Sequence, residues 1–193
     1  MKRLATCLLI ATTGAFAGSS TDSLLPNPDL DSGIDGWSGR SGAEVSWESG
    51  EDVDGDPNSG SARIVQVRDD ADFAGLDSAC FPIVGGEYDF GGWFFIDGAQ
   101  PGDYGILLTL QVFNGPDCSG AVVASPGTNN FAQADTWFLK ITGGRSLPAG
   151  SASAQLRVSV FNRSPEPFEV LADGFFIIGR IFDDGFELGQ AAG

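Results

Sequence analysis

Residues 88–97 read YDFGGWFFID, and this aromatic stretch decides the class of fold. Its side chains alternate with the two-residue period of a β-strand. One face would carry Tyr88, Phe90, Phe94 and Ile96, and the other Asp89, Trp93, Phe95 and Asp97. A bulge within the Gly91-Gly92 pair would exchange the two faces, because one added residue reverses the alternation. The stretch predicts a long strand with an aromatic face.

The rest of the chain repeats the pattern in shorter form, with apolar runs between Gly, Pro, Asn, Asp and Ser turns and no convincing helical period. Further strands are expected at 24–30, 43–48, 61–67, 73–80, 106–113, 121–125, 136–142, 153–161 and 168–178. Two of them have a fully apolar face that should be core, namely Ile106, Leu108, Leu110 and Val112, and Leu156, Val158 and Val160. The sequence therefore predicts one all-β sandwich of about ten strands.

The chain opens with the features of a secretory signal peptide. Lys2 and Arg3 precede an apolar stretch too short to span a bilayer, and residues 15–17 (AFA) have the small-x-small pattern of a cleavage site. We expect a signal over 1–17, the β-sandwich over 18–178 and a C-terminal tail over 179–193. The expected location is secreted and extracellular, with the periplasm left open. Membrane insertion of the mature chain is not expected.

The C-terminal tail contains a short motif of its own. Residues 182–187 read FDDGFE and resemble the FxDGFE element found at the end of many secreted proteins of some Gram-negative bacteria. The resemblance covers a few residues and implies no known chemistry. A loosely packed terminal strand is the alternative interpretation.

The charge of the chain limits its partners. The formal net charge is −16, and removing the signal leaves eight basic and 26 acidic residues, a net charge of −18. Nucleic acid and anionic membrane surfaces are disfavoured, because both need clustered Lys and Arg. Such acidity is favoured as a solvated surface that keeps an exported protein soluble, and it also fits calcium binding.

Cysteine and histidine usage constrains the chemistry further. Two cysteines remain after the signal, Cys80 and Cys118, and in an oxidising compartment such a pair most simply forms one disulfide. The chain has no histidine. Ser-His-Asp and Cys-His catalysis and every His-ligated metal site are therefore excluded. Paired carboxylates acting on a glycosidic bond remain as the conventional hydrolytic mechanism.

Three segments together resemble a known family. Residues 27–33 read NPDLDSG and are followed by Gly36 and Trp37, residues 59–64 read SGSARI, and residues 172–177 read ADGFFI. In this order they are similar to the NxxFExGxxGW opening, the SGSxSL turn and strand, and the closing Asp-before-apolar strand of CenC-type carbohydrate-binding modules. The resemblance implies a galactose-binding-like jelly-roll β-sandwich that binds polysaccharide or glycan without catalysis.

The family often carries a structural calcium ion. The resemblance implies that Asp31 and Asp173 would meet at the metal, with oxygens from the segment of Ser59 and Ser61 joining them. Calcium takes six to eight hard oxygen ligands, which fits such a set. Asp31 stands where these modules have Glu, so its reach is shorter.

The loop over 48–58 is the densest acidic stretch. Asp52, Asp54 and Asp56 match positions 1, 3 and 5 of an EF-hand loop, but Pro57 stands where that loop needs Gly and Arg63 where it needs Glu. An EF-hand is therefore rejected. A looser calcium site and a solvated acidic turn both remain open.

Sugar binding needs aromatic planes and polar groups on one exposed face. Strand alternation turns Trp93, Gln111 and Arg157 outward, so that the three could share a concave, ligand-facing sheet. Trp37, Trp47 and Trp137 are expected in the core, and Trp93 beneath a loop is the alternative to a sugar site.

The function expected from these observations is a secreted, non-catalytic carbohydrate-binding module with a calcium site. A surface or matrix protein that uses the sandwich for protein contacts is the alternative, and a small carbohydrate-active enzyme ranks last. The sequence leaves the glycan and the oligomeric state open.

Overall fold

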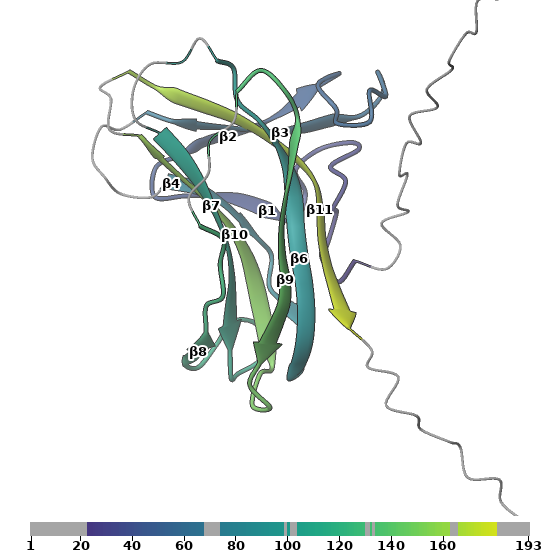
Figure 1. Cartoon of the computed structure of the whole chain (residues 1–193), viewed down its shortest axis with the longest axis vertical. Helices are drawn as coiled ribbons and strands as arrows, with labels where there is room; N and C mark the ends of the chain where they lie inside the picture. The colour runs from purple at the N-terminus through teal and green to yellow at the C-terminus, as the bar shows by residue number, and fades with distance from the viewer. Residues whose placement is uncertain are drawn as a thin grey trace, which may run out of the picture.

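The computed structural model describes residues 23–67, 74–98, 100, 104–129, 132, 134–162 and 166–180. Within them the chain forms eleven strands, arranged as two antiparallel sheets packed face to face (Figure 1). The strands are β1 (Trp37–Arg40), β2 (Glu44–Ser49), β3 (Gly60–Gln66), β4 (Ala74–Ser78), β5 (Phe81–Pro82), β6 (Gly86–Phe95), β7 (Tyr104–Phe113), β8 (Val122–Ala124), β9 (Phe138–Leu147), β10 (Ser153–Asn162) and β11 (Phe168–Arg180). The predicted signal over 1–17 and the FxDGFE element lie outside the described residues. The described residues contain no helix that is long and apolar enough to cross a membrane.

The two sheets take their strands from distant parts of the chain. The first sheet has the order β1-β4-β10-β7-β8, with β5 also paired to β10, and the second has the order β2-β3-β11-β6-β9. From β6 onward the chain passes repeatedly between the sheets, which is the jelly-roll arrangement that the family resemblance implies. The single all-β sandwich is thereby confirmed.

The core lies between the sheets and contains the side chains that the alternation turned inward. The seven predicted core residues of β7 and β10 are fully buried, and they are Ile106, Leu108, Leu110, Val112, Leu156, Val158 and Val160. Over residues 88–97, the face that lies in the core is the one with Tyr88, Phe90, Phe94 and Ile96, which are at most 6% exposed. Each large apolar side chain buried in this way contributes about 1.5–3 kcal/mol. The two glycines of β6 do not exchange its faces. An added Cβ on Gly92 would meet the Phe175 ring at 2.6 Å, so this glycine leaves room for a core aromatic of β11.

Four sequence expectations need correction. Residues 24–30 form bends and no strand, because Pro26 and Pro28 lack the N–H groups that a ladder requires. The first strand is β1, and the two-residue β5 was also not predicted. Phe113 belongs to the face of its strand opposite the predicted core, and alternation therefore predicts it outward, but it is 8% exposed at a point where the β7–β8 ladder shifts its register. Trp47 and Trp137, expected in the core, are only partly buried, whereas Trp37 is a core residue.

Strand β11 contains a bulge that reverses its alternation. Asp173 pairs with Trp93, but the next aligned pair is Phe176 with Gly91, and Gly174 between them has a φ of +53°. Glycine adopts this left-handed conformation without steric cost. Asp173 therefore lies on the outer face of the second sheet, whereas Phe175 points into the core and packs against Trp37, with ring centroids 4.4 Å apart and an interplanar angle of 32°.

The predicted disulfide is present. Cys80 follows β4, Cys118 lies in the turn after β7, and their Cα atoms are 5.8 Å apart. The backbone N–H of Cys118 donates to Ser153 Oγ at 2.9 Å, which attaches the turn to the start of β10. The bond joins residues 38 positions apart, so it stabilises the fold by about 4 kcal/mol in the chain-entropy description.

Candidate functional site

The outer face of the first sheet carries a shallow groove with a volume of about 280 Å³. Its lining residues come from β1, β7 and β10, and they are Arg40, Leu107, Thr109, Gln111, Arg157 and Ser159. The antiparallel register sets them in rows, because Arg157 lies between Asp77 and Thr109, and Ser159 lies between Gly75 and Leu107. These residues alternate with the core residues of the same strands, which fixes their outward direction.

Two arginines converge on one aspartate at the edge of the groove. Asp77 is 6% exposed, and its Oδ1 accepts a hydrogen bond from Arg40 Nε at 2.9 Å. Arg157 Nε lies 3.4 Å from Asp77 Oδ2. Arg40 also reaches across β4 to donate from Nη2 to Ser159 Oγ at 2.8 Å. A buried carboxylate needs such partners, and because it has two, the three groups together carry a net charge of +1.

Gln155 holds Arg157 in position. Gln155 Oε1 accepts from Arg157 Nε at 3.3 Å and from Nη2 at 3.0 Å. The other end of the same amide, Nε2, donates to the carbonyl of Ser78 at 2.8 Å. The guanidinium plane is thus fixed before any ligand arrives, which lowers the ordering cost of binding.

The structure brings together two of the three residues predicted to face a sugar. Gln111 and Arg157 both line the groove, but Trp93 lies on β6 of the second sheet. The expectation that all three share one sheet is therefore wrong. Alternation along a strand assigns inward and outward faces, but it does not say which sheet the strand joins, and the outer faces of the two sheets point in opposite directions.

Trp93 packs beside the acidic loop that follows β2. An added Cβ on Gly174 would lie 2.9 Å from Trp93 Cδ1 and 3.7 Å from Val53 Cγ1, so the indole occupies space that this glycine leaves open near the loop. Its ring is partly buried. This placement matches the alternative in which Trp93 lies under a loop.

Asp173 lies in the same region and is almost completely buried. It is 1% exposed, and its carboxylate accepts the N–H of Gly174 at 2.7 Å and that of Val53 at 3.3 Å. Burial raises the pKa of Asp173 to about 7, with the nearby carboxylates of Asp52 and Asp29 adding to the rise and the two hydrogen bonds opposing it. No cation pairs with Asp173 in the described part of the chain.

The other predicted calcium ligands form a second pair. Ser59 Oγ donates to Asp31 Oδ1 at 3.3 Å. Ser61 belongs with Asp173, because the ladder that aligns Ala172 with Ala62 sets Ser61 beside Asp173, and Ser61 Oγ is buried without a hydrogen-bond partner. Among the described residues no three His, Cys, Asp or Glu side chains gather around one metal position.

Two carboxylates of the acidic loop, those of Asp52 and Asp56, accept hydrogen bonds within the loop. Asp52 Oδ1 accepts the backbone N–H groups of Asp54 at 2.7 Å and Asp56 at 3.1 Å, and Asp56 Oδ1 accepts that of Asn58 at 2.8 Å. Short side-chain acceptors commonly stabilise turns in this way. These hydrogen bonds explain the aspartates at positions 52 and 56 by their role in stabilising the turn itself.

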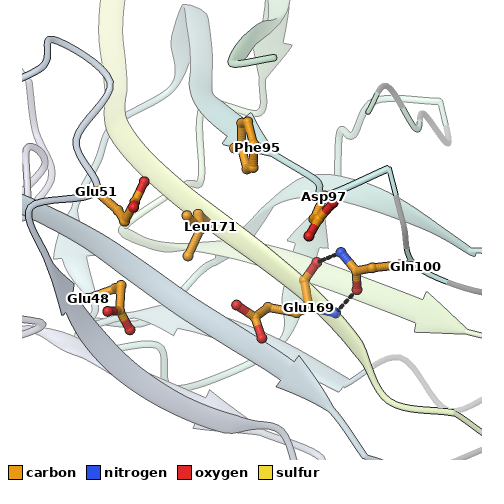
Figure 2. A pocket seen from close by; sticks show the side chains of 7 residues that line it. All are labelled: Glu48, Glu51, Phe95, Asp97, Gln100, Glu169 and Leu171. Carbon is orange, nitrogen blue, oxygen red and sulfur yellow. Dashed lines mark hydrogen bonds between the residues drawn. The ribbon is translucent and has the colours of Figure 1, made fainter. Parts of the chain in front are cut away.

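A larger and more acidic pocket lies on the second sheet. Its volume is about 420 Å³, and Figure 2 shows its lining residues Glu48, Glu51, Phe95, Asp97, Gln100, Glu169 and Leu171. The side chain of Gln100 hydrogen-bonds both the N–H and the C=O of Glu169, and the Glu169 carboxylate pairs with Arg63. Beyond the end of β6, the Gln100 amide therefore pairs with the backbone of β11 as a neighbouring strand would.

Sequence reasoning missed Arg40, which lines the groove, and Asp77, which pairs with both of its arginines. Arg40 ends a strand that was not predicted at all. Asp77 offered a usable signal, because it is a charged residue inside the otherwise small and apolar run AGLDS of β4. A charged side chain in such a run needs a partner, and here the partners come from two other strands.

No protein-family model matches this sequence, and neither does any curated protein. Solved structures do match the fold. The chain is 15% identical to a domain of tailspike protein 4 of bacteriophage CBA120, covering 82% of this chain and 22% of that one with a TM-score of 0.62. It thus spans about a quarter of that chain and of an α-L-arabinofuranosidase chain, of which it covers 28%.

Two other matches extend along whole modules. One is a family 61 carbohydrate-binding module in complex with β-1,4-galactotriose, at 11% identity and a TM-score of 0.54, covering 82% of this chain and 99% of that one. The other is the C-terminal family 22 carbohydrate-binding module of Clostridium thermocellum Xyn10B, at 13% identity and a TM-score of 0.57, covering 79% and 90%. At these identities the matches establish the fold alone.

Proposed function

We propose that this chain is a non-catalytic carbohydrate-binding domain that holds its glycan in the groove on the outer face of the first sheet. The main support for this proposal is the arrangement of polar side chains in the groove. It presents fixed donors and acceptors on the paired strands β1, β4, β7 and β10, and sheet positions hold side chains more rigidly than loops do. The fold is one that isolated carbohydrate-binding modules share over nearly their whole length.

The chemistry of the groove suits sugar hydroxyl groups. Among the described residues, neither the Gln111 amide nor the Thr109 hydroxyl has a hydrogen-bond partner, so both are open to a ligand. A hydroxyl group donates one hydrogen bond and accepts two, and an amide beside a hydroxyl can satisfy both roles. Without histidine, a pair of carboxylates is the conventional hydrolytic mechanism that remains, and none of the described lining residues of the groove is a carboxylate.

The binding face can be tested by comparing two variants on opposite sheets. Insoluble-polysaccharide pull-down and a glycan array should show binding by the wild type that falls about tenfold in Gln111→Ala and persists in Trp93→Ala. Gln111 has no described side-chain hydrogen bond to lose, so its melting temperature should hold. Loss of binding in Trp93→Ala alone, with the fold intact, would move the site to the second sheet.

Calcium binding near Asp173 is part of the same proposal. The residues fit this metal, because a buried carboxylate without a cation partner lies beside the orphaned Ser61 hydroxyl, and Asp29 and Asp52 are near enough to affect the pKa of Asp173. Calcium would supply the missing positive charge and be held by Asp173, Ser61 and backbone carbonyl oxygens. Asp31 and Ser59 would take part if they turn from each other toward the ion. The melting temperature with calcium and with a chelator tests this site.

We also propose export through the signal over residues 1–17. The Cys80–Cys118 disulfide supports an oxidising compartment, where such bonds persist. Detection of the protein in medium or periplasm, with residue 18 as its N-terminus, is the test. Retention of the uncleaved chain in the cytoplasm would contradict it.

A protein-contact role is the second candidate. Edge strand β9 exposes Leu139 by 39% and Ile141 by 52% on the outer face of the second sheet. Exposed edges and apolar side chains together favour pairing with another chain. Self-association that disappears in Ile141→Lys, in a protein that binds no glycan, would favour this role.

A further inference from the structure

We infer that the groove is built for an acidic sugar, and that Arg157 binds the carboxylate of a uronic acid residue within an anionic glycan. This inference rests on the proposed function and names its ligand class.

The charges of the two sheets differ. The strands of the first sheet contain two arginines, Arg40 and Arg157, and one carboxylate, Asp77. The strands of the second sheet contain six carboxylates and four basic residues. In a chain with a formal net charge of −16, the groove is thus a local site of positive charge. Strands that only needed a soluble surface would not gather two of the few basic residues around one buried aspartate.

The guanidinium of Arg157 has one edge occupied and one edge open. Gln155 Oε1 binds the side edge, formed by Nε and Nη2, and Asp77 lies near Nε. The end edge, formed by Nη1 and the second hydrogen of Nη2, has no partner in the described structure, and Arg157 lines the groove. Two parallel N–H groups match the two oxygens of a carboxylate, so this edge can donate two hydrogen bonds to one anion.

Arg40 and Asp77 keep this edge in place. Asp77 is held by Arg40 at 2.9 Å, so it contributes a fixed negative charge that orients Arg157 without neutralising both arginines. Gly75 lies between Arg40 and Ser159 in its row and has no side chain, which lets the Arg40 side chain cross β4 to Ser159. The result is a preorganised cluster of polar side chains in the groove, with the Arg157 guanidinium held at Nε and Nη2.

The groove lacks the feature that neutral sugars usually need. None of its six described lining residues is aromatic, and Leu107 is the only large apolar one. Stacking on an aromatic plane is the main apolar contact available to a neutral sugar ring. A charge-assisted pair with a carboxylate supplies affinity without such a plane.

The test compares the acid and ester forms of the same oligosaccharides. Isothermal titration would use α-1,4-linked galacturonate and β-1,4-linked glucuronate oligomers, their fully methyl-esterified forms, neutral xylo-oligosaccharide and galactotriose, a sulfated galactan, and polyglutamate. We expect one acid oligomer to bind at least about tenfold more tightly than its methyl ester, as for a hydrogen bond between charged groups. Arg157→Gln should abolish this preference, and Arg157→Lys should restore part of it.

The matched control is Arg145→Gln, which removes the same charge from an exposed position on β9 of the second sheet. Equal loss in this variant, or equal binding of polyglutamate, would overturn the inference in favour of general charge attraction. Tighter binding of the sulfated galactan than of any uronate would overturn the choice of carboxylate. Equal binding of acid and ester, or of neutral oligomers only, would overturn the inference and leave the proposed function standing. Failure of every glycan to bind would reject both.

Discussion

Asp173 shows how one residue can link stability to pH. Its carboxylate is 1% exposed and has two backbone N–H groups as partners but no cation among the described residues. Burial raises its pKa to about 7 from an ordinary value of 3.8. The folded state therefore holds a proton that the unfolded state has already lost between these two pH values. The stability due to the neutral form is complete below pH 4 and is lost as the pH rises to about 7, by at most about 4 kcal/mol.

We predict that the variant Asp173→Asn loses this pH dependence. In chelator, the free energy of unfolding of the wild type should fall from pH 4 to pH 7 more steeply than that of the variant, which has no proton to lose there. Above pH 7, calcium should raise the melting temperature of the wild type and leave that of the variant unchanged, because the metal needs the carboxylate.

Asp31→Asn is the matched control for this prediction, because Asp31 is an exposed carboxylate of the other predicted pair. It should keep the wild-type slope between pH 4 and pH 7. Urea denaturation measures the free energy of unfolding at each pH. If this free energy changes equally for the wild type and Asp173→Asn from pH 4 to pH 7, Asp173 does not have this role.

At the scale of elements, the close approach of β4 and β10 depends on Gly75. An added Cβ at this position would lie 1.9 Å from the carbonyl oxygen of Val158, which is backbone and cannot rotate away. Glycine inside a strand usually weakens it by about 0.5–1 kcal/mol relative to alanine. At position 75 alanine should instead be the less stable of the two residues, because β4 and β10 must separate to accept its methyl group.

We therefore predict that Gly75→Ala destabilises the fold by about 1–3 kcal/mol, the usual cost of overpacking. Glycan binding should weaken in parallel, because Asp77 on β4 would move away from Arg157 on β10. Denaturant unfolding and titration calorimetry measure the two effects. Gly150→Ala is the control, since an added Cβ there meets nothing within 4 Å, and its stability should change by less than about 0.5 kcal/mol. A Gly75→Ala protein as stable as this control would refute the argument.

The same elements indicate what the sequence could predict. Alternation placed the core of β7 and β10 and the outward direction of Gln111 and Arg157, because one face of each strand is wholly apolar. It could not assign β6 to the opposite sheet, since strand pairing is set by contacts between distant segments. It also could not find the bulge at Gly174, because a glycine in a strand is equally compatible with regular pairing. Trp93 was expected beside the groove because the alternation could not show that β6 belongs to the other sheet.

For the whole molecule, the disulfide is the one covalent bond between distant parts of the fold that the described residues contain. It joins the end of β4 to the turn after β7, and neither cysteine lines the groove. Its contribution is thus expected in global stability and not in the geometry of the site.

We predict that the double variant Cys80→Ser with Cys118→Ser is about 4 kcal/mol less stable than the oxidised wild type and still binds glycan when folded. Guanidinium unfolding should give the same loss for wild type measured under reducing conditions, which is the internal control. A loss below about 1 kcal/mol, or loss of binding in a variant shown to be folded, would contradict this interpretation.

The uneven distribution of charge also affects how fast the molecule meets its ligand. A chain with a net charge of −16 is repelled by an anionic polymer over most of its surface, whereas the positively charged groove attracts it. Added salt weakens both forces, but over different distances, since the Debye length is about 10 Å at 0.1 M. Salt should therefore speed association by screening the long-range repulsion, and speed dissociation by weakening the contact at Arg157. The two rate constants would rise together, so the lifetime of the complex shortens with salt faster than its affinity declines.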